Sequence, residues 1–386
     1  MKATENLIIN MKKRTISLLY GVETKTHQMM TRLREKLWYE KDINGIKQKL
    51  SQCDVTPLSP AQKKDIVAYW KHLTGKTVPL FWHEYFYSRN GKYSEKYVPS
   101  CLYHSDIAYH LNCRPLTMAY TDKCSYDVYF TDIWRPKTRV RNINGYFFDE
   151  NRPISKEEAL ERCANLKSAV IKPSLIGMWG TGVRVFSTMD GMLNEKESVE
   201  DLFTRFGVNF IVQDKVEQHE EMSRLNPTSL NTLRFLTYRR ADEVVILYAV
   251  VRIGRKDKVV DNETAGGINA DIDLDNGRII DCAYGTPSEK RILNTDVGTV
   301  LKDFQIPSFE QAASLVKDLH LRLPYFHLVG WDFGIDKDGR PIMIEWNRCP
   351  DLSQTAHGPA FGDLTEEIVR FAMQQPDTFD SRMWNG

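Results

Sequence analysis

Residues 330–351 have the sequence GWDFGIDKDGRPIMIEWNRCPD, in which two apolar runs flank the turn sequence DKDG. This pattern predicts a β-hairpin. Its first strand carries Asp332, and its second carries Glu345 and Asn347. Residues two apart on a strand point to the same face, and the partner strand lies alongside. We therefore expect these three side chains to lie together.

The chemistry of these side chains indicates a metal site. Two carboxylates and an amide oxygen are hard ligands, which suit Mg²⁺ that carries nucleotide phosphates. A charged hairpin facing solvent is the alternative. It is weakened because apolar residues flank the acids, and acids embedded among apolar groups need a cation. The flanking residues are Val329, Phe333, Ile342, Ile344 and Trp346. We expect Mg²⁺ at Asp332, Glu345 and Asn347, with Mn²⁺ as a possible substitute.

A second element, SAVIKPSLIGMWGTGVRVF at residues 168–186, predicts a strand that ends at Lys172, a loop with Gly177, Gly180 and Gly182, and another strand. Glycines let backbone N–H groups approach an anion, and a lysine supplies the point charge that phosphates need. The segment is not a P-loop, because GxxxxGK[ST] is absent. An ordinary glycine-rich hairpin explains this segment equally well when it is considered alone.

Two further elements are strands with polar positions. NFIVQDKVEQH at 209–219 turns polar at Gln213, Lys215 and Glu217, and such a strand can offer backbone groups to an adenine edge. An ordinary edge strand is the alternative. SLNTLRFLTYRR and YAVVRIGR place Arg234 and Arg252 on neighbouring strands, where guanidinium groups can bind phosphate or carboxylate. Arginines on exposed strand faces are also common.

The composition narrows the class of protein. Lys and Arg total 52 against 51 Asp and Glu, so the net charge gives no reason to expect a nucleic acid or an anionic membrane as partner. The N-terminus does not resemble a signal peptide, and no run approaches the ~18–20 apolar residues of a membrane span. Seven cysteines occur without CxxC spacing, which favours free thiols. We expect a cytoplasmic protein.

The chain divides into a helical extension at 1–55, a helical and aromatic region at 56–118, and mixed α+β texture beyond it. Antiparallel strands are expected in this α+β part, rather than regular βαβ units. Two of its helices are predicted to begin at serine caps, Ser155 and Ser308.

Taken in order, the four elements resemble the ATP-grasp superfamily, and the chain looks like its sugar-transfer associated branch, over residues 119 to about 360. The resemblance implies a fold of two α+β lobes that enclose ATP, a lid lobe at 119–212 and a core lobe at 213–386. It implies that Lys123, in TDKCSYDVYF, and Lys172 hold the phosphates. The other implied ATP-binding residues are Gly177, Gly180, Gly182, Gln213, Lys215, Val216 and Asn262, and the implied metal ligands are Asp332, Glu345 and Asn347.

The activity that the resemblance implies is an ATP- and Mg²⁺-dependent carboxylate–amine ligase, which releases ADP and acts through an acyl phosphate in polysaccharide biosynthesis. Lys172, Arg234 and Arg252 would be catalytic, and the partners would be small-molecule acids and amines. One alternative is an ATP-dependent sugar phosphotransferase, which would transfer the terminal phosphoryl group to a sugar hydroxyl with Asp271, Asp273 or His357 as base. Another is a scaffold that binds ATP without turnover. The oligomeric state stays open.

Overall fold

The predicted hairpin forms one edge of a six-stranded antiparallel sheet, the core sheet. The computed structural model describes residues 37, 39–175, 182–194, 196–258, 261 and 266–375. The side chain of Arg114 is not among the described parts. The strand order is β12-β11-β10-β9-β13-β14. The strands are β9 (Thr232–Arg240), β10 (Glu243–Ile253), β11 (Ile268–Ile272), β12 (Ile279–Tyr284), β13 (Leu328–Ile335) and β14 (Pro341–Asn347).

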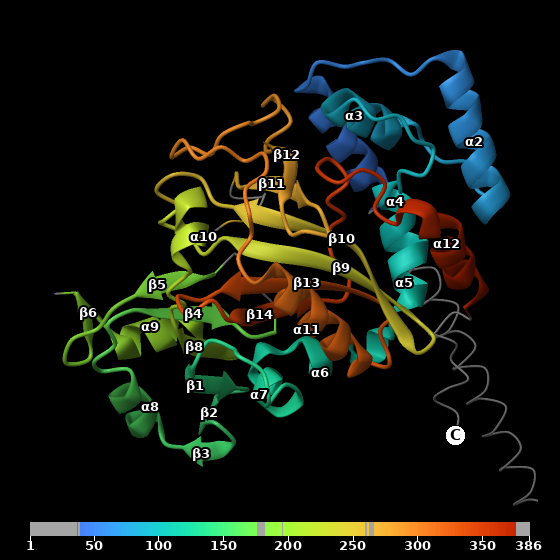
Figure 1. Cartoon of the computed structure of the whole chain (residues 1–386). Helices are drawn as coiled ribbons and strands as arrows, with labels where there is room; N and C mark the ends of the chain where they lie inside the picture. The colour runs from blue at the N-terminus through green and yellow to red at the C-terminus, as the bar shows by residue number, and fades with distance from the viewer. Residues whose placement is uncertain are drawn as a thin grey trace, which may run out of the picture.

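A second six-stranded antiparallel sheet, the lid sheet, lies beside the core sheet at the lower left of Figure 1 and has the order β3-β2-β1-β8-β4-β5. Its strands are β1 (Thr138–Ile143), β2 (Tyr146–Asp149), β3 (Arg152–Ile154), β4 (Ala169–Pro173), β5 (Arg184–Phe186) and β8 (Phe210–Asp214). Helices α8 (Lys156–Arg162) and α9 (Val199–Phe206) pack on it, and β6 (Met192–Asn194) pairs with β7 (Glu197–Ser198) nearby.

The two faces of the core sheet are covered differently. Helix α11 (Phe309–Leu321) packs on one face, together with α10 (Glu220–Leu225) and α7 (Tyr126–Tyr129). The other face meets helices from both ends of the described chain (Figure 1). These are α2 (Pro60–Thr74), α4 (Ser100–Leu102), η1 (Tyr103–Ile107), α5 (Ala108–Leu111) and α12 (Thr365–Gln374).

The described part of the N-terminal region is helical. Residues 39–51 are helical, and α3 (Phe81–Asn90) buries its aromatic side chains against them. The remaining short elements are α6 (Arg114–Thr121), η2 (Lys123–Ser125) and η5 (Gly362–Leu364). The α+β class with a helical region before the sheets is thus confirmed, as is the antiparallel pairing. The exact boundaries given above stay predictions.

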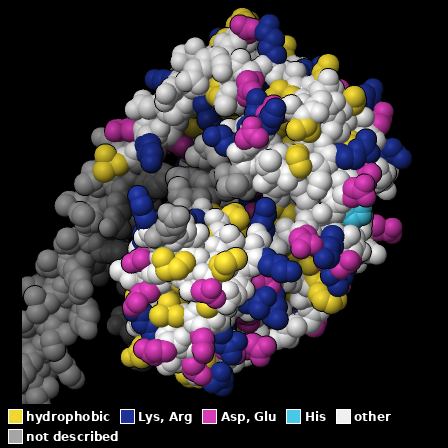
Figure 2. All heavy atoms as spheres, turned by 90° about the vertical axis from the view of Figure 1, so that its left-hand side faces the viewer, with side chains coloured by type: hydrophobic (Ala, Val, Ile, Leu, Met, Phe, Trp, Pro, Cys, Tyr) yellow, Lys and Arg dark blue, Asp and Glu magenta, His cyan; other side chains and the backbone are white. Residues whose placement is uncertain are grey.

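Charge is mixed over the surface. Figure 2 shows Lys and Arg side chains interspersed with Asp and Glu over the face that it presents, without a large area of one sign. This distribution agrees with the balanced composition. Among the described residues, no helix has both the length and the apolar character needed to cross a membrane.

Two of the helix starts differ from the sequence expectation. Ser155 caps α8 as predicted, but Ser308 makes no cap for α11, because it has a left-handed backbone with φ 54° and its hydroxyl donates to the carbonyl of Gly339 at 2.6 Å. Helix α9 begins at a serine cap, Ser198, that was not predicted from the sequence. The Ser198 hydroxyl accepts a hydrogen bond from the N–H of Asp201, whose carboxylate accepts from the N–H of Ser198.

We predict that Ser198→Ala lowers the free energy of unfolding by about 1 kcal/mol, because the α9 N-terminus then has an unsatisfied N–H group. The matched control is Ser288→Ala, an exposed serine outside any helix start. Thermal unfolding of both variants checks the prediction. Equal melting temperatures for Ser198→Ala and the control would show that the capping box does not stabilise the protein.

Candidate functional site

The polar residues of the core sheet gather on one face, the face that also meets the N-terminal helices. Strand register produces this arrangement. Arg234 of β9 faces Asp332 of β13, and Asp332 in turn faces Glu345 of β14. Val250 of β10 pairs with Arg234, and Arg252 lies two residues further along β10. Arg252 therefore lies on the same face as Arg234. Four adjacent strands therefore each contribute a charged side chain.

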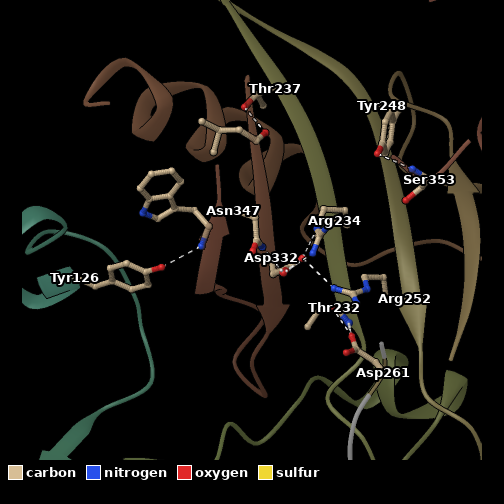
Figure 3. Close-up of polar contacts among 12 residues, drawn as sticks. Tyr126, Thr232, Arg234, Thr237, Tyr248, Arg252, Asp261, Asp332, Asn347 and Ser353 are labelled. Carbon is tan, nitrogen blue, oxygen red and sulfur yellow. Dashed lines mark hydrogen bonds and ion pairs between the residues drawn. The ribbon is translucent and has the colours of Figure 1, made fainter. Parts of the chain in front are cut away.

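Arg234 and Asp332 form a buried bidentate ion pair (Figure 3). Nε and Nη2 of Arg234 donate to the two carboxylate oxygens at 2.6 and 2.8 Å. Arg252 Nη1 reaches the same carboxylate at 3.5 Å. Burial raises the pKa of Asp332, but the two guanidinium groups outweigh it and hold the pKa below its usual value. The carboxylate is therefore ionised at neutral pH.

Two lysines converge on Glu345 from the lid side. Lys123 Nζ lies 3.2 Å from Glu345 Oε2. The Lys123 N–H donates to the carbonyl of Ser174, two residues after Lys172, at 3.2 Å. The Lys172 side chain is buried, and its pKa is lowered to about 8. Burial is the main cause, Lys123 adds to it, and Glu345 partly opposes it. The lysine pair thus carries more positive charge than Glu345 neutralises.

The three expected metal ligands lie together, and their donor set fits a hard cation. Asn347 Nδ2 donates to Asp332 Oδ2 at 3.3 Å, which leaves the amide oxygen of Asn347 available. Each carboxylate oxygen accepts at two positions, and Arg234 takes one position on each oxygen of Asp332. The longer contacts from Arg252 at 3.5 Å and Asn347 at 3.3 Å take the other two, so a cation would replace these longer contacts. Mg²⁺ completes its shell with water and phosphate oxygens. Within the described ranges, no metal site is formed by three or more His, Cys, Asp and Glu side chains. The candidate site has two such side chains, Asp332 and Glu345, and the amide of Asn347.

The expected adenine hinge lies between the two sheets. Gln213 belongs to β8, and its side chain donates within the lid sheet, to the Pro136 carbonyl and the Thr138 hydroxyl at 3.3 Å each. The chain then crosses through Lys215 and Val216 to the core sheet, where the N–H of His219 donates to the carbonyl of Ile335. The backbone N–H of Lys215 donates to the carbonyl of Ser168.

The glycine loop is described only at its end. Gly182 has φ 81°, and a Cβ there would lie 3.1 Å from the ring of Pro173, so this position requires glycine. Gly177, Gly180 and Asn262 lie outside the described residues.

The profile of the family described as sugar-transfer associated ATP-grasp matches residues 142–368, more than half of the chain. The chain belongs to this ATP-grasp family. A comparison with curated proteins found no match.

Solved structures resemble this ATP-grasp chain at low identity. They include the D-alanyl-alanine synthetase A of Vibrio cholerae, with 15% identity, 68% of each chain covered and a TM-score of 0.40. A D-cycloserine synthetase matches with 14% identity, 67% and 71% coverage and a TM-score of 0.39. The biotin carboxylase domain of Hydrogenobacter thermophilus 2-oxoglutarate carboxylase matches with 15% identity and a TM-score of 0.38; this chain spans 45% of its length, and 66% of this chain is covered.

Sequence reasoning missed one acid beside the candidate site. The Asp261 carboxylate accepts hydrogen bonds from both the N–H and the hydroxyl of Thr232 (Figure 3). Burial raises the pKa of Asp261, and Arg252 opposes this shift. The only available signal was its place in a polar stretch between two strands. Asp273, named as a possible base, instead holds a turn, where it accepts from the N–H of Asp275 and from the Asn276 side chain.

We predict that Glu345→Gln lowers the pKa of Lys172 further below about 8, because the carboxylate that raises it is lost while Lys123 remains. Titration of the lysine Cε resonances by NMR, with Lys172→Arg to assign the signal, measures this pKa. The matched control is Glu217→Gln, which removes the exposed partner of Lys337 outside the site. An unchanged Lys172 titration in Glu345→Gln would contradict the electrostatic coupling.

Proposed function

We propose that the chain is an ATP- and Mg²⁺-dependent ligase that joins a carboxylate to an amine through an acyl phosphate and releases ADP. The observation that carries the proposal is the convergence of Lys123 and Lys172 on Glu345, next to Asp332 and Asn347. Two cations beside one carboxylate favour a polyanion such as a triphosphate. The two carboxylates and the amide would hold the metal that accompanies it.

In this proposal the lysines bind and orient the outer phosphates of ATP. Mg²⁺, held by Asp332, Glu345 and Asn347, would supply Lewis-acid stabilisation of phosphoryl charge. A carboxylate oxygen of the acid substrate attacks the terminal phosphorus, and the bond to the leaving oxygen breaks, so ADP departs with the electron pair. The reaction depends mainly on positioning and on electrostatic stabilisation, because little covalent chemistry is left for the protein.

The arginines are suited to hold the acyl phosphate. Arg234 uses Nε and Nη2 on Asp332, which leaves its Nη1 available. Arg252 makes only a long contact of 3.5 Å to the same carboxylate. Both guanidinium groups lie on the face that carries the carboxylates, so they can donate to phosphoryl oxygens formed there. Gln213, Lys215 and Val216, at the junction of the sheets, would border the adenine, with Gly177, Gly180, Gly182 and Asn262 completing the ATP site.

The wider role follows from the family description. We propose that the substrates are small-molecule acids and amines, such as sugar acids, amino acids or glycan precursors, used in cell-surface polysaccharide biosynthesis in the cytoplasm. The term sugar-transfer associated in the family description supports this role.

A second candidate is phosphoryl transfer to a sugar hydroxyl. The observation that favours it is a hydrogen-bonded pair, His357 and Asp271, on the same face of the core sheet, which could serve as a base. Both reactions use the same phosphate site. They differ in the product, because the ligase forms an acyl phosphate and the phosphotransferase forms a stable phosphate ester.

We predict that the protein, with Mg²⁺ and ATP, forms a hydroxamate from an acid in a panel of amino acids and uronic acids when hydroxylamine is present. Hydroxylamine intercepts acyl phosphates but not phosphate esters, and ADP should appear with the hydroxamate. A colorimetric iron assay and ADP detection measure the two products, with Lys172→Ala as the matched inactive control. ADP formation with the phosphoryl group recovered in an alkali-stable ester would refute the ligase and support the second candidate.

A further inference from the structure

Asp271 and His357 form a pair beyond Arg252 on the polar face of the core sheet. Asp271 of β11 faces Val250 of β10, which faces Arg234 of β9. The Asp271 carboxylate therefore lies two strands from the ion pair, on the same face. Nδ1 of His357 lies 2.9 Å from Oδ1 of Asp271. The carboxylate side chain is 10% exposed and the imidazole 26% exposed, so the carboxylate is shielded while the imidazole reaches solvent.

The segment that carries His357 is fixed on this face. It follows β14 directly, so it continues from Asn347. The Tyr248 hydroxyl accepts the N–H of Ser353 at 2.9 Å, and the Tyr103 hydroxyl donates to the Pro350 carbonyl at 2.9 Å. The His357 ring stacks on Tyr248, with ring centres 4.9 Å apart. Contacts from β10 and from η1 therefore fix the segment and orient the imidazole.

The orientation of the ring leaves one nitrogen for chemistry. An ionised carboxylate on Nδ1 favours the tautomer with its proton on that nitrogen, so that Nε2 can accept a proton. Among the described residues, Nε2 of His357 has no hydrogen-bond partner. The ligase described above needs such a group, because an amine is mostly a cation at neutral pH and cannot attack carbon until it loses a proton.

The charged and titratable neighbours come from several elements. Asp271 of β11 faces the ring edge, and Tyr248 of β10 faces the ring plane. Arg234 of β9, and Asp351 of the same segment as the histidine, act electrostatically on Tyr248. Tyr103 of η1 interacts with Tyr248 and Asp351 in the same way. Burial raises the pKa of both tyrosines, so neither competes for protons near neutral pH.

We propose that His357, positioned by Asp271, is the base that removes a proton from the incoming amine; this rests on the ligase function proposed above. The amine nitrogen loses one proton to Nε2 and attacks the carbonyl carbon of the acyl phosphate. As the carbon–nitrogen bond forms, the bond from carbon to the phosphate oxygen breaks. Phosphate leaves with that electron pair, the product nitrogen loses its remaining extra proton to water, and the imidazolium returns its proton to solvent.

The test compares two nucleophiles that differ in their need for a base. Hydroxylamine is mostly neutral at pH 7, whereas ammonia is mostly protonated. The probe acid is the one that gives most hydroxamate in the panel above, and ammonium chloride supplies ammonia. Asp271→Asn keeps the size of the side chain and its hydrogen bond, but the amide donates to Nδ1, so the proton moves to Nε2 and blocks it.

We expect Asp271→Asn and His357→Gln to lower amide formation from ammonia by about 10²–10⁴-fold at pH 7, the usual effect of losing a general base. Hydroxamate formation should persist in both, and the loss of amide should shrink as the pH rises and ammonia becomes neutral. The matched control is His327→Gln. His327 is also half-buried and packs on an aromatic ring, Phe371, but it lies outside the site.

The results separate this inference from the proposed function. Equal loss of hydroxamate and amide, or no loss of either, would overturn the role of His357 and leave the ligase standing. Hydroxamate without any amide from ammonia in the unsubstituted protein would do the same. If the unsubstituted protein forms neither product from any acid in the panel, the ligase function fails, and the base role fails with it. A purely structural role would give a loss that does not depend on pH or on the nucleophile.

Discussion

The buried ion pair between Arg234 and Asp332 is the constraint on which the geometry of the site depends. It joins the side chains of β9 and β13, two neighbouring strands of the core sheet, on the face that carries the other charged groups. A charge that leaves water needs a well-placed partner, and loss of one partner from a buried pair costs about 3–5 kcal/mol. The bidentate geometry meets this need for both residues. It also fixes the carboxylate opposite Glu345, so the position of the proposed metal site follows from the pairing of the strands.

Charge is balanced differently at the two ends of this face. Arg234 and Arg252 are matched by Asp332 and Asp261, whereas Lys123 and Lys172 share Glu345. Burial lowers the pKa of Lys172, and the second lysine close by lowers it further, with only Glu345 to oppose them. An anion bound between the two lysines would remove this penalty. This imbalance supports the proposal that a polyphosphate binds between the two lysines.

The sequence predicted the elements whose signals are local. The hairpin around DKDG has its turn and its alternating strands within one segment, so the pairing of Asp332 with Glu345 could be expected. Strand β11 was not predicted, because Asn269 and Asp271 place polar side chains on one of its faces and interrupt the apolar pattern. The failed cap at Ser308 has a tertiary cause, its bond to Gly339. The His357–Asp271 pair joins residues 86 apart, and only the folded sheet brings them together.

In the proposed reaction, the phosphoryl group passes to a carboxylate oxygen before an amine attacks. Transfer of ¹⁸O from a doubly labelled acid substrate tests this most directly. If an acyl phosphate forms, one labelled oxygen must leave with the phosphate, so mass spectrometry should find one ¹⁸O in each inorganic phosphate and none in ADP. Unlabelled phosphate beside a labelled product acid or ester, or label recovered in AMP, would contradict the account.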